Sequence, residues 1–471
     1  MKNAKRLLAL FTLLALVLSL ASCAMGNGGF MNKAEGDDGG YMDRAPSIGG
    51  GDYSGGKPSL DADATLGDVA DSDDAAGAPE SSDPSKGESG DEPDKPTEDT
   101  TTVTRPAGLI TAGAWNDNAN YDYWKSLFEQ SAEKNGKFYT YTGEKSWGFD
   151  SYNRLKVTVT HSDGDSGAVA GAAVIAKNAD GKVIYKAVTD ANGVAFLFTG
   201  GESGSVTVSS GDSTVTESFT GAADEEIAIK LDAPAEKKNI IDIMFVVDVT
   251  GSMGDELEFL KNELTDVINR VAANEAHATI NLALLFYRDH TDKVPFAYFD
   301  FTDVTNAENL AAQQANLNTQ FADGGGDWPE AVDEALELAV GKQWSTAATT
   351  KLIFHILDAP PHSKDKNKET FGAAVDIAAE KGIRYCPIIC SGADTLTEYV
   401  ARQAAIHTAG TFIFVTDDSG IGGSHHDPGL PNVTVEALNS LLVRVINGYH
   451  SGEFAPPVYW KTEQLNNQNK Q

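Results

Sequence analysis

Hydrophobic and polar positions follow several different patterns along this chain, and each pattern predicts a different kind of structure. Residues 7–20 form one apolar run, and 24–105 carry few large aliphatic side chains. Short runs of alternating apolar and polar residues fill 155–231. From residue 238 onward, apolar runs of strand length alternate with segments of helical spacing. The chain is therefore predicted to contain a leader, a linker and two folded domains of different class.

The segment 154–233 is predicted to be a β-sandwich, because turn-forming pairs such as Asn192-Gly193 separate seven short alternating runs. Its turn chemistry resembles that of carboxypeptidase regulatory-like and bacterial Ig-like domains, which implies a non-catalytic module. The aromatic-rich segment 106–153 is interpreted as a cap, with a short helix at 120–134 and a strand at 138–142. The sandwich strands are expected at 155–160, 172–177, 183–188, 194–198, 205–209, 214–219 and 226–231.

Residues 238–450 predict a doubly wound, Rossmann-like α/β domain, and 451–471 are assigned to a C-terminal tail. The run Ile240–Val247 is almost continuously apolar, as expected of a central parallel strand buried on both faces. Apolar residues recur at helical spacing in 255–273, and strands and helices alternate from there to residue 449. In sheets of this kind ligands bind beyond the carboxyl ends of the strands. Side chains at those ends are therefore the candidates for a site.

Oxygen-bearing side chains gather where the predicted strands end. The first strand ends in Asp248-Val249-Thr250-Gly251-Ser252, and a later strand ends at Asp358. The loop Gly324-Gly325-Gly326-Asp327-Trp328-Pro329-Glu330 lies between them along the chain. Carboxylates and hydroxyls are hard ligands that suit Mg²⁺, with Ca²⁺ or Mn²⁺ as alternatives. In the competing interpretation no metal binds, and Thr250 and Ser252 only cap the helix that follows.

The motif Asp248-Val249-Thr250-Gly251-Ser252 resembles the metal-ion-dependent adhesion site of the von Willebrand factor type A (vWA) domain. The resemblance covers about 210 residues. It implies that Thr250 and Ser252 bind a divalent cation directly, that Asp248 and Asp358 bind it directly or through water, and that a protein partner supplies an acidic residue. The family often has a Thr where this chain has Gly326, so the fifth ligand is open, and the following Asp327 is the candidate.

The N-terminus is predicted to be a bacterial lipoprotein signal. Three basic residues precede the apolar run Leu7–Leu20, which is too short to cross a bilayer comfortably. The run ends in Leu20-Ala21-Ser22-Cys23, which resembles a lipobox and implies a signal peptide of residues 1–22 and lipidation of Cys23. The alternative is an ordinary secretory signal with an incidental cysteine. The lipoprotein interpretation implies an extracytoplasmic protein anchored to the cell membrane or the outer membrane.

Charge separates the linker from the folded part. The whole chain has a formal net charge of −33, and residues 24–105 hold 19 acidic and 6 basic residues. The segment 23–105 cannot bury enough apolar surface to offset the entropy of ordering, so it is predicted to be a disordered spacer. A chain of this charge without a basic patch repels phosphate backbones, so no nucleic-acid partner is predicted.

These features favour a membrane-anchored binding protein that holds a protein partner through a divalent cation. A metal-dependent hydrolase stays open, with His362 and Asp289 as the candidate bases, and so does an envelope assembly subunit. The sequence contains no phosphate-binding loop, dinucleotide fingerprint, His-Glu-x-x-His or nucleophile elbow, so no enzymatic activity is predicted. Three further groups receive structural interpretations: Tyr287-Arg288-Asp289-His290 as an ion pair near the site, His425-His426-Asp427 as solvated surface, and Cys386 and Cys390 as buried thiols.

Overall fold

The computed structural model describes residues 108–131, 134–162, 167–232, 239–326, 328–346, 350–419 and 424–468. The predicted signal peptide, Cys23 and the linker lie outside these residues, and so does Asp327. Among the described residues, no helix combines the length and the apolar character needed to span a membrane.

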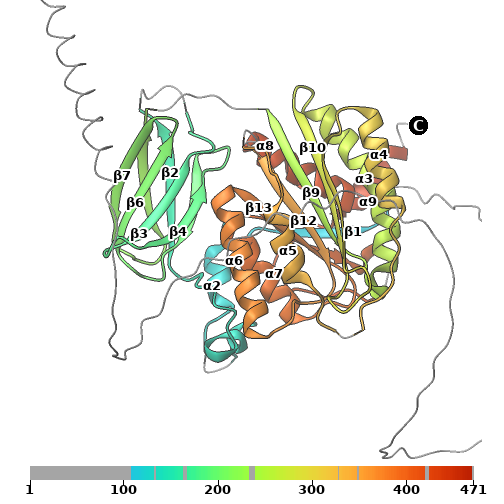
Figure 1. Ribbon diagram of the computed structural model, residues 1–471, viewed down its shortest axis with the longest axis horizontal. Coiled ribbons are helices and arrows are strands. Elements are labelled where there is room, and N and C mark those ends of the chain that lie inside the picture. The colour runs from blue at the N-terminus through green and yellow to red at the C-terminus, as the bar shows by residue number, and fades with distance from the viewer. Residues whose placement is uncertain are drawn as a thin grey trace, which may run out of the picture. The chain divides into compact units, whose positions relative to one another are not determined.

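One mixed eight-stranded sheet lies at the centre of the α/β part (Figure 1). Five neighbouring strands, β10, β9, β12, β13 and β14, run parallel, and β11 and β1 pair antiparallel with the two ends of this parallel set. The order across the sheet is β11 (Phe296–Asp303), β10 (Thr279–Tyr287), β9 (Ile240–Asp248), β12 (Thr350–Leu357), β13 (Ile383–Ile389), β14 (Phe412–Thr416), β1 (Thr111–Trp115) and β15 (Glu436–Ala437).

Helices cover both faces of this sheet, which confirms the predicted α/β class. Successive side chains of β9 enter different cores: Phe245 packs with α3, α4 and α8, whereas Met244 and Val246 belong to the core that contains α5, α6 and α7. Cys386 and Cys390 are buried and free, as predicted. The helices are α3 (Gly254–Asn274), α4 (Ala307–Asn318), α5 (Val332–Gly341), α6 (Asp365–Lys381), α7 (Thr395–His407), α8 (Leu438–Ser451) and, in the segment assigned to the tail, α9 (Trp460–Gln468).

Strand β1 comes from the segment that the sequence analysis assigned to a cap. It pairs antiparallel with β14, from Thr111 opposite Thr416 to Trp115 opposite Phe412, and β15 lies on its other side. The α/β sheet is therefore completed by residues that precede the other folded part in the sequence.

The rest of the aromatic-rich segment is mostly irregular. Its helix α2 spans only Tyr121–Ser126, and the strand predicted at 138–142 is wrong, because a 3₁₀ turn (Tyr139–Tyr141) occupies this position. The aromatic side chains there pack against α7 instead of joining a sheet. The ring of Tyr141 stacks on that of Tyr399, with ring centroids 4.6 Å apart.

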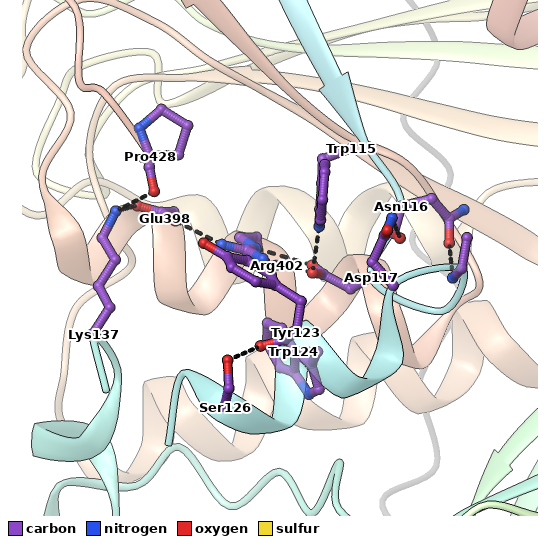
Figure 2. A network of polar contacts seen from close by, with 12 residues as sticks. Trp115, Asn116, Asp117, Tyr123, Trp124, Ser126, Lys137, Glu398, Arg402 and Pro428 are labelled. Atoms are coloured by element: carbon purple, nitrogen blue, oxygen red, sulfur yellow. Dashed lines mark hydrogen bonds and ion pairs between the residues drawn. The ribbon is translucent and has the colours of Figure 1, made fainter. Parts of the chain in front are cut away.

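A buried ion-pair network joins this N-terminal segment to α7 (Figure 2). The side chain of Arg402 is fully buried, and its guanidinium donates to both carboxylate oxygens of Asp117, at 2.6 and 2.9 Å. It also donates to Glu398 at 2.8 Å. The Trp115 indole donates to Asp117 at 3.0 Å. Because each buried charge has an opposite charge within hydrogen-bonding distance, the network can remain ionised out of contact with water.

The seven strands between residues 154 and 231 form two sheets with a shared apolar core. Strands β2 and β8 pair in parallel, and the other neighbours pair antiparallel. This unit contacts the α/β part through β4, where the Tyr185 hydroxyl donates to the carbonyl of His407 at 2.7 Å. One sheet is β5 (Val194–Phe198), β2 (Arg154–His161) and β8 (Glu225–Leu231), and the other is β4 (Val183–Val188), β3 (Ala173–Asn178), β6 (Gly204–Ser210) and β7 (Ser213–Phe219).

The Arg402 network predicts a large effect for a single truncation. The substitution Asp117→Ala leaves a buried guanidinium with only Glu398 as its carboxylate partner, so we expect the free energy of unfolding to fall by about 3–5 kcal/mol, measured by urea denaturation. The control is Asp122→Ala, which removes the exposed partner of Lys125 and should cause no measurable change. Equal stability of the two variants would contradict the role of the network.

Candidate metal centre

The order of the strands brings three loops together at one edge of the sheet. Strand β9 lies between β10 and β12 and is parallel to both, so the three carboxyl ends point the same way. Asp248 is the last residue of β9, Asp358 directly follows β12, and Asp289 comes two residues after β10. Neighbouring strands in a sheet are roughly 5 Å apart. Side chains that are far apart in the sequence therefore meet at this edge.

The loop after β9 arranges its polar side chains around Asp248, which is completely buried. The Oδ1 atom of Asp248 accepts hydrogen bonds from the backbone N–H of Thr250 at 2.8 Å and from the Thr250 hydroxyl at 2.7 Å. The hydroxyls of Thr250 and Ser252 lie 3.4 Å apart, and Ser252 is exposed. The other carboxylate oxygen of Asp248 has no hydrogen-bond partner among the described residues.

Two further carboxylates at this edge carry buried oxygens without partners. Both carboxylate oxygens of Asp358, and Oε2 of Glu330, lack a hydrogen-bond partner within the described ranges. The Glu330 backbone N–H donates to the Pro360 carbonyl at 3.1 Å, which holds the glycine-rich loop against the segment after β12. An unpartnered buried carboxylate is unfavourable unless a proton or a cation neutralises it. Three such carboxylates at one sheet edge therefore point to a cation.

The glycine loop leaves space at this place. Gly325 has φ of +85°, and a Cβ atom there would lie 2.9 Å from Oε1 of Glu330 and 3.4 Å from Cβ of Thr250. A side chain at Gly325 would therefore fill the gap between the two residues. The cavity next to it measures about 220 Å³, and Thr250, Ser252, Asp358 and Glu330 contribute to its lining.

The electrostatics of these carboxylates also favour the binding of a positive charge. Burial raises the pKa of Asp248 to about 7, and the nearby Asp358 carboxylate adds to the shift. Burial raises the pKa of Glu330 to about 9, and the charges of Asp248 and Asp289 add to it. Burial likewise raises the pKa of Asp358. A hard divalent cation would allow all three groups to ionise, so the residues fit Mg²⁺ or a similar ion.

The structure places the predicted residues Asp248, Thr250, Ser252 and Asp358 at this one sheet edge, whereas Asp327 lies outside the described residues. Their ligation of a metal stays a prediction. Glu330 was not among the predicted ligands, although this residue closes the same loop motif. The sequence does show a carboxylate that directly follows a proline and closes a loop with three consecutive glycines. Only the fold shows that this carboxylate is buried near Asp248.

A second group of ligand-type side chains lies at the same edge. Oδ1 of Asp289 is 2.9 Å from Nδ1 of His290 and 2.9 Å from Nε2 of His362. Burial acts to raise the pKa of Asp289, but hydrogen bonds from His362 and Thr291 outweigh it and hold the pKa at about 2. Arg288 donates instead to the Asp323 carbonyl at 2.7 Å. Asp289 of this motif therefore pairs with the two histidines, and not with Arg288.

A von Willebrand factor A domain is found at residues 242–408 by comparison with protein-family profiles. The match begins inside β9 and ends directly after α7. It therefore includes Asp248, Asp358 and the glycine-rich loop, but neither β14 nor β1.

Two curated proteins share 28% identity with this chain over about a third of its length. One is an ariadne-like RING finger protein of Acanthamoeba polyphaga mimivirus, matched over 141 residues, which are 30% of this chain and 13% of that protein. The other is the alpha-protein kinase vwkA of Dictyostelium discoideum, matched over 149 residues, which are 30% of this chain and 22% of that protein. The chain therefore spans less than a quarter of either relative.

Among solved structures, three bacterial proteins match at low identity. BatB of Bacteroides thetaiotaomicron matches with 14% identity and a TM-score of 0.30, over 44% of this chain and 98% of that one. The pilus adhesin SpaC of Lactobacillus rhamnosus GG matches with 12% identity and a TM-score of 0.34, over 53% and 33%. The PilB minor pilin of Streptococcus sanguinis matches with 11% identity and a TM-score of 0.29, over 63% and 93%. Similarity at this level identifies neither a ligand nor a partner.

The raised pKa values predict how stability without metal depends on pH. The native chain keeps protons on Asp248 and Glu330 that the unfolded chain releases near pH 4. In EDTA the free energy of unfolding should therefore fall as the pH rises, up to about pH 7 for Asp248 and about pH 9 for Glu330. Each group contributes a slope of up to about 1.4 kcal/mol per pH unit. Urea unfolding at a series of pH values measures this slope.

The substitution Glu330→Gln should remove its share of that slope, because the amide keeps the shape of the protonated carboxyl group but cannot ionise. The control is Glu337→Gln on the exposed side of α5, which should leave the slope as in the unmodified chain. Saturating Mg²⁺ should also flatten the profile of the unmodified chain by stabilising the ionised form. A slope that Glu330→Gln leaves unchanged would contradict the assignment of Glu330 to this cluster.

Proposed function

We propose that this chain is an extracytoplasmic binding protein whose vWA domain holds a protein partner through a divalent cation. The observation that supports this function best is the set of buried oxygens on Asp248, Asp358 and Glu330 that have no hydrogen-bond partner among the described residues and lie beside a cavity. The hydroxyl of Ser252 lies at the exposed side of the same loop. The charge and the hardness of this set favour Mg²⁺, with Ca²⁺ or Mn²⁺ as alternatives.

Each residue has a distinct task in this proposal. Thr250 and Ser252 offer neutral hydroxyl ligands, and Asp248 and Asp358 supply most of the negative charge, directly or through water. The hydrogen bond from Thr250 fixes the carboxylate of Asp248. Because hydroxyls donate little electron density, the cation stays electrophilic and attracts a carboxylate from the partner. Glu330, at the end of the glycine-rich loop, adds a third carboxylate beside the same cavity.

The remaining parts of the chain suit presentation of this site away from a membrane. The signal 1–22, the lipidated Cys23 and the acidic segment 23–105 make an anchor and a spacer in this proposal. Several acyl chains on one cysteine would hold the protein stably, whereas a single chain binds only marginally. The two-sheet unit, which we interpret as an Ig-like or carboxypeptidase regulatory-like β-sandwich, is inserted in the chain between β1 and β9 of the α/β part and adds a second module to it.

A metal-dependent hydrolase is the second candidate, and one observation favours it. His362 is hydrogen-bonded to Asp289 at 2.9 Å, as a general base and its orienting carboxylate would be. Against this role, Oδ1 of Asp289 also accepts from His290, so the carboxylate is shared between two imidazoles. We therefore favour binding over catalysis. An accessory role in envelope assembly would use the same binding site.

The test of the proposed function is partner capture that depends on both metal and Asp248. The full chain, immobilised in Mg²⁺, should retain a protein from an envelope extract, and EDTA should release it. The substitution Asp248→Ala should abolish capture, because it removes a buried ligand, whereas Asp255→Ala, on the exposed first turn of α3, should not.

Capture that survives EDTA and Asp248→Ala would rule out the adhesion-site mechanism. The same preparations also address the hydrolase alternative. Turnover of a phosphoester or peptide substrate that is lost with Asp248→Ala, and equally with His362→Gln, would favour the enzyme over the binding protein.

The proposed anchor predicts a change of compartment for one substitution. Cys23→Ser removes the thiol that would carry the lipid, so the protein should move from the detergent phase to the aqueous phase in Triton X-114 partitioning. The control Met25→Leu leaves the cysteine in place and should stay in the detergent phase. If Cys23→Ser also partitions into detergent, the lipid-anchor proposal is wrong.

A further inference from the structure

We propose that Asp289, His290 and His362 form a second cation site, which takes a borderline transition metal such as Zn²⁺. The site shares no ligand with the cluster around Asp248, so it does not depend on the adhesion-site proposal. Two imidazole nitrogens and one carboxylate oxygen make up its donor set. Zn²⁺ accepts nitrogen and oxygen donors of this kind, whereas Mg²⁺ prefers oxygen alone.

The geometry of the three donors is close to that of a metal site. Nδ1 of His290 and Nε2 of His362 each lie 2.9 Å from Oδ1 of Asp289, and the ligand atoms all lie within 4.8 Å of one another. Tetrahedral Zn²⁺ with bonds of about 2.0–2.1 Å needs ligand atoms about 3.3 Å apart. To replace the two hydrogen bonds by metal bonds, the imidazole nitrogens would move slightly away from Asp289 and closer to each other.

The three residues also differ in exposure as an open metal site requires. The side chain of Asp289 is completely buried and that of His362 is 10% exposed, so both are fixed by their surroundings. The side chain of His290 is 43% exposed, which gives an ion from solvent a route to the donors. A water molecule can then supply the fourth ligand, as it does in zinc sites with three protein ligands.

The charges around these donors attract a cation rather than an anion. The carboxyl group of Glu330 lies close enough to Asp289 and Asp292 to feel their charges, and Asp333 lies within the same range of His362. Arg288 is a positive charge in the same loop as Asp289. Its guanidinium donates hydrogen bonds to the backbone carbonyls of Asp323 and Phe321.

A cation here would tie together two loops that also shape the first site. Asp289 follows β10 and His362 follows β12, and the Asp289 backbone N–H donates to Asp292 at 3.1 Å. The same carboxylate oxygen of Asp292 accepts from the backbone N–H of Gly325 at 3.0 Å. Gly325 borders Glu330 and Thr250. The second site therefore positions the glycine-rich loop without contributing a ligand to the first.

Metal titration of the full chain tests the proposal. In saturating Mg²⁺, calorimetry with Zn²⁺ should show one tight equivalent, and Asp248→Ala should retain it because the donors are intact. His290→Gln should weaken this binding at least about tenfold, since it removes a first-sphere donor and even outer-sphere changes cost about 10–100-fold. With Co²⁺ as probe, the visible absorption of a nitrogen-ligated ion should be lost in the same variant.

Two variants keep the result interpretable. The side chain of His290 is partly exposed, so His290→Gln should fold normally even if substitutions at the buried Asp289 do not. The control is His425→Gln, because His425 also pairs with a carboxylate, that of Asp417 at 2.6 Å, but belongs to no three-ligand cluster in the described part of the chain. The proposal fails if the unmodified chain takes up no stoichiometric Zn²⁺, or if His290→Gln binds Zn²⁺ as tightly as His425→Gln.

Discussion

Repulsion between buried carboxylates at the carboxyl edge of the parallel sheet is the constraint on which the rest of the site depends. Parallel pairing places the ends of β10, β9 and β12 beside one another, and each strand has an acidic residue at its last position or within two residues after it. Burial prevents water from screening these charges, so protons or cations must neutralise them. The hydroxyls of the first loop and the glycine-rich loop are then the groups through which the chain accommodates an ion there.

The two acidic clusters at this edge are balanced differently. Around Asp248 the neighbouring donors are hydroxyls and backbone amides, and several carboxylate oxygens have no partner among the described residues. Around Asp289 two imidazoles already satisfy the carboxylate. Asp292 links the clusters, because it accepts from the backbones of both Asp289 and Gly325. Hard and borderline donor sets thus lie within one connected group of loops.

Most elements could be predicted because local patterns determine them. Turn pairs such as Asn192-Gly193 separated the strands of the two-sheet unit, and the apolar run in β9 marked the central parallel strand. Strand β1 was not predicted, because the sequence Thr111–Trp115 is mostly Gly and Ala and its pairing with β14 is set by tertiary contacts. The strand expected at 138–142 failed for the converse reason: its aromatic residues pack on α7. At the site, the contiguous motif was evident, but the burial of Glu330 depends on a loop conformation that a sequence pattern does not reveal.

The position of β1 also constrains when this domain can become complete. Thr111 precedes its hydrogen-bond partner Thr416 by 305 residues. At a synthesis rate of about 5–20 residues per second, the first strand of the sheet is made roughly 15–60 s before the strand that it pairs with. The earliest part of the folded chain is thus among the last to find its place. Until then β14 has an open edge, and contacts this distant in sequence slow folding because a long loop must close first.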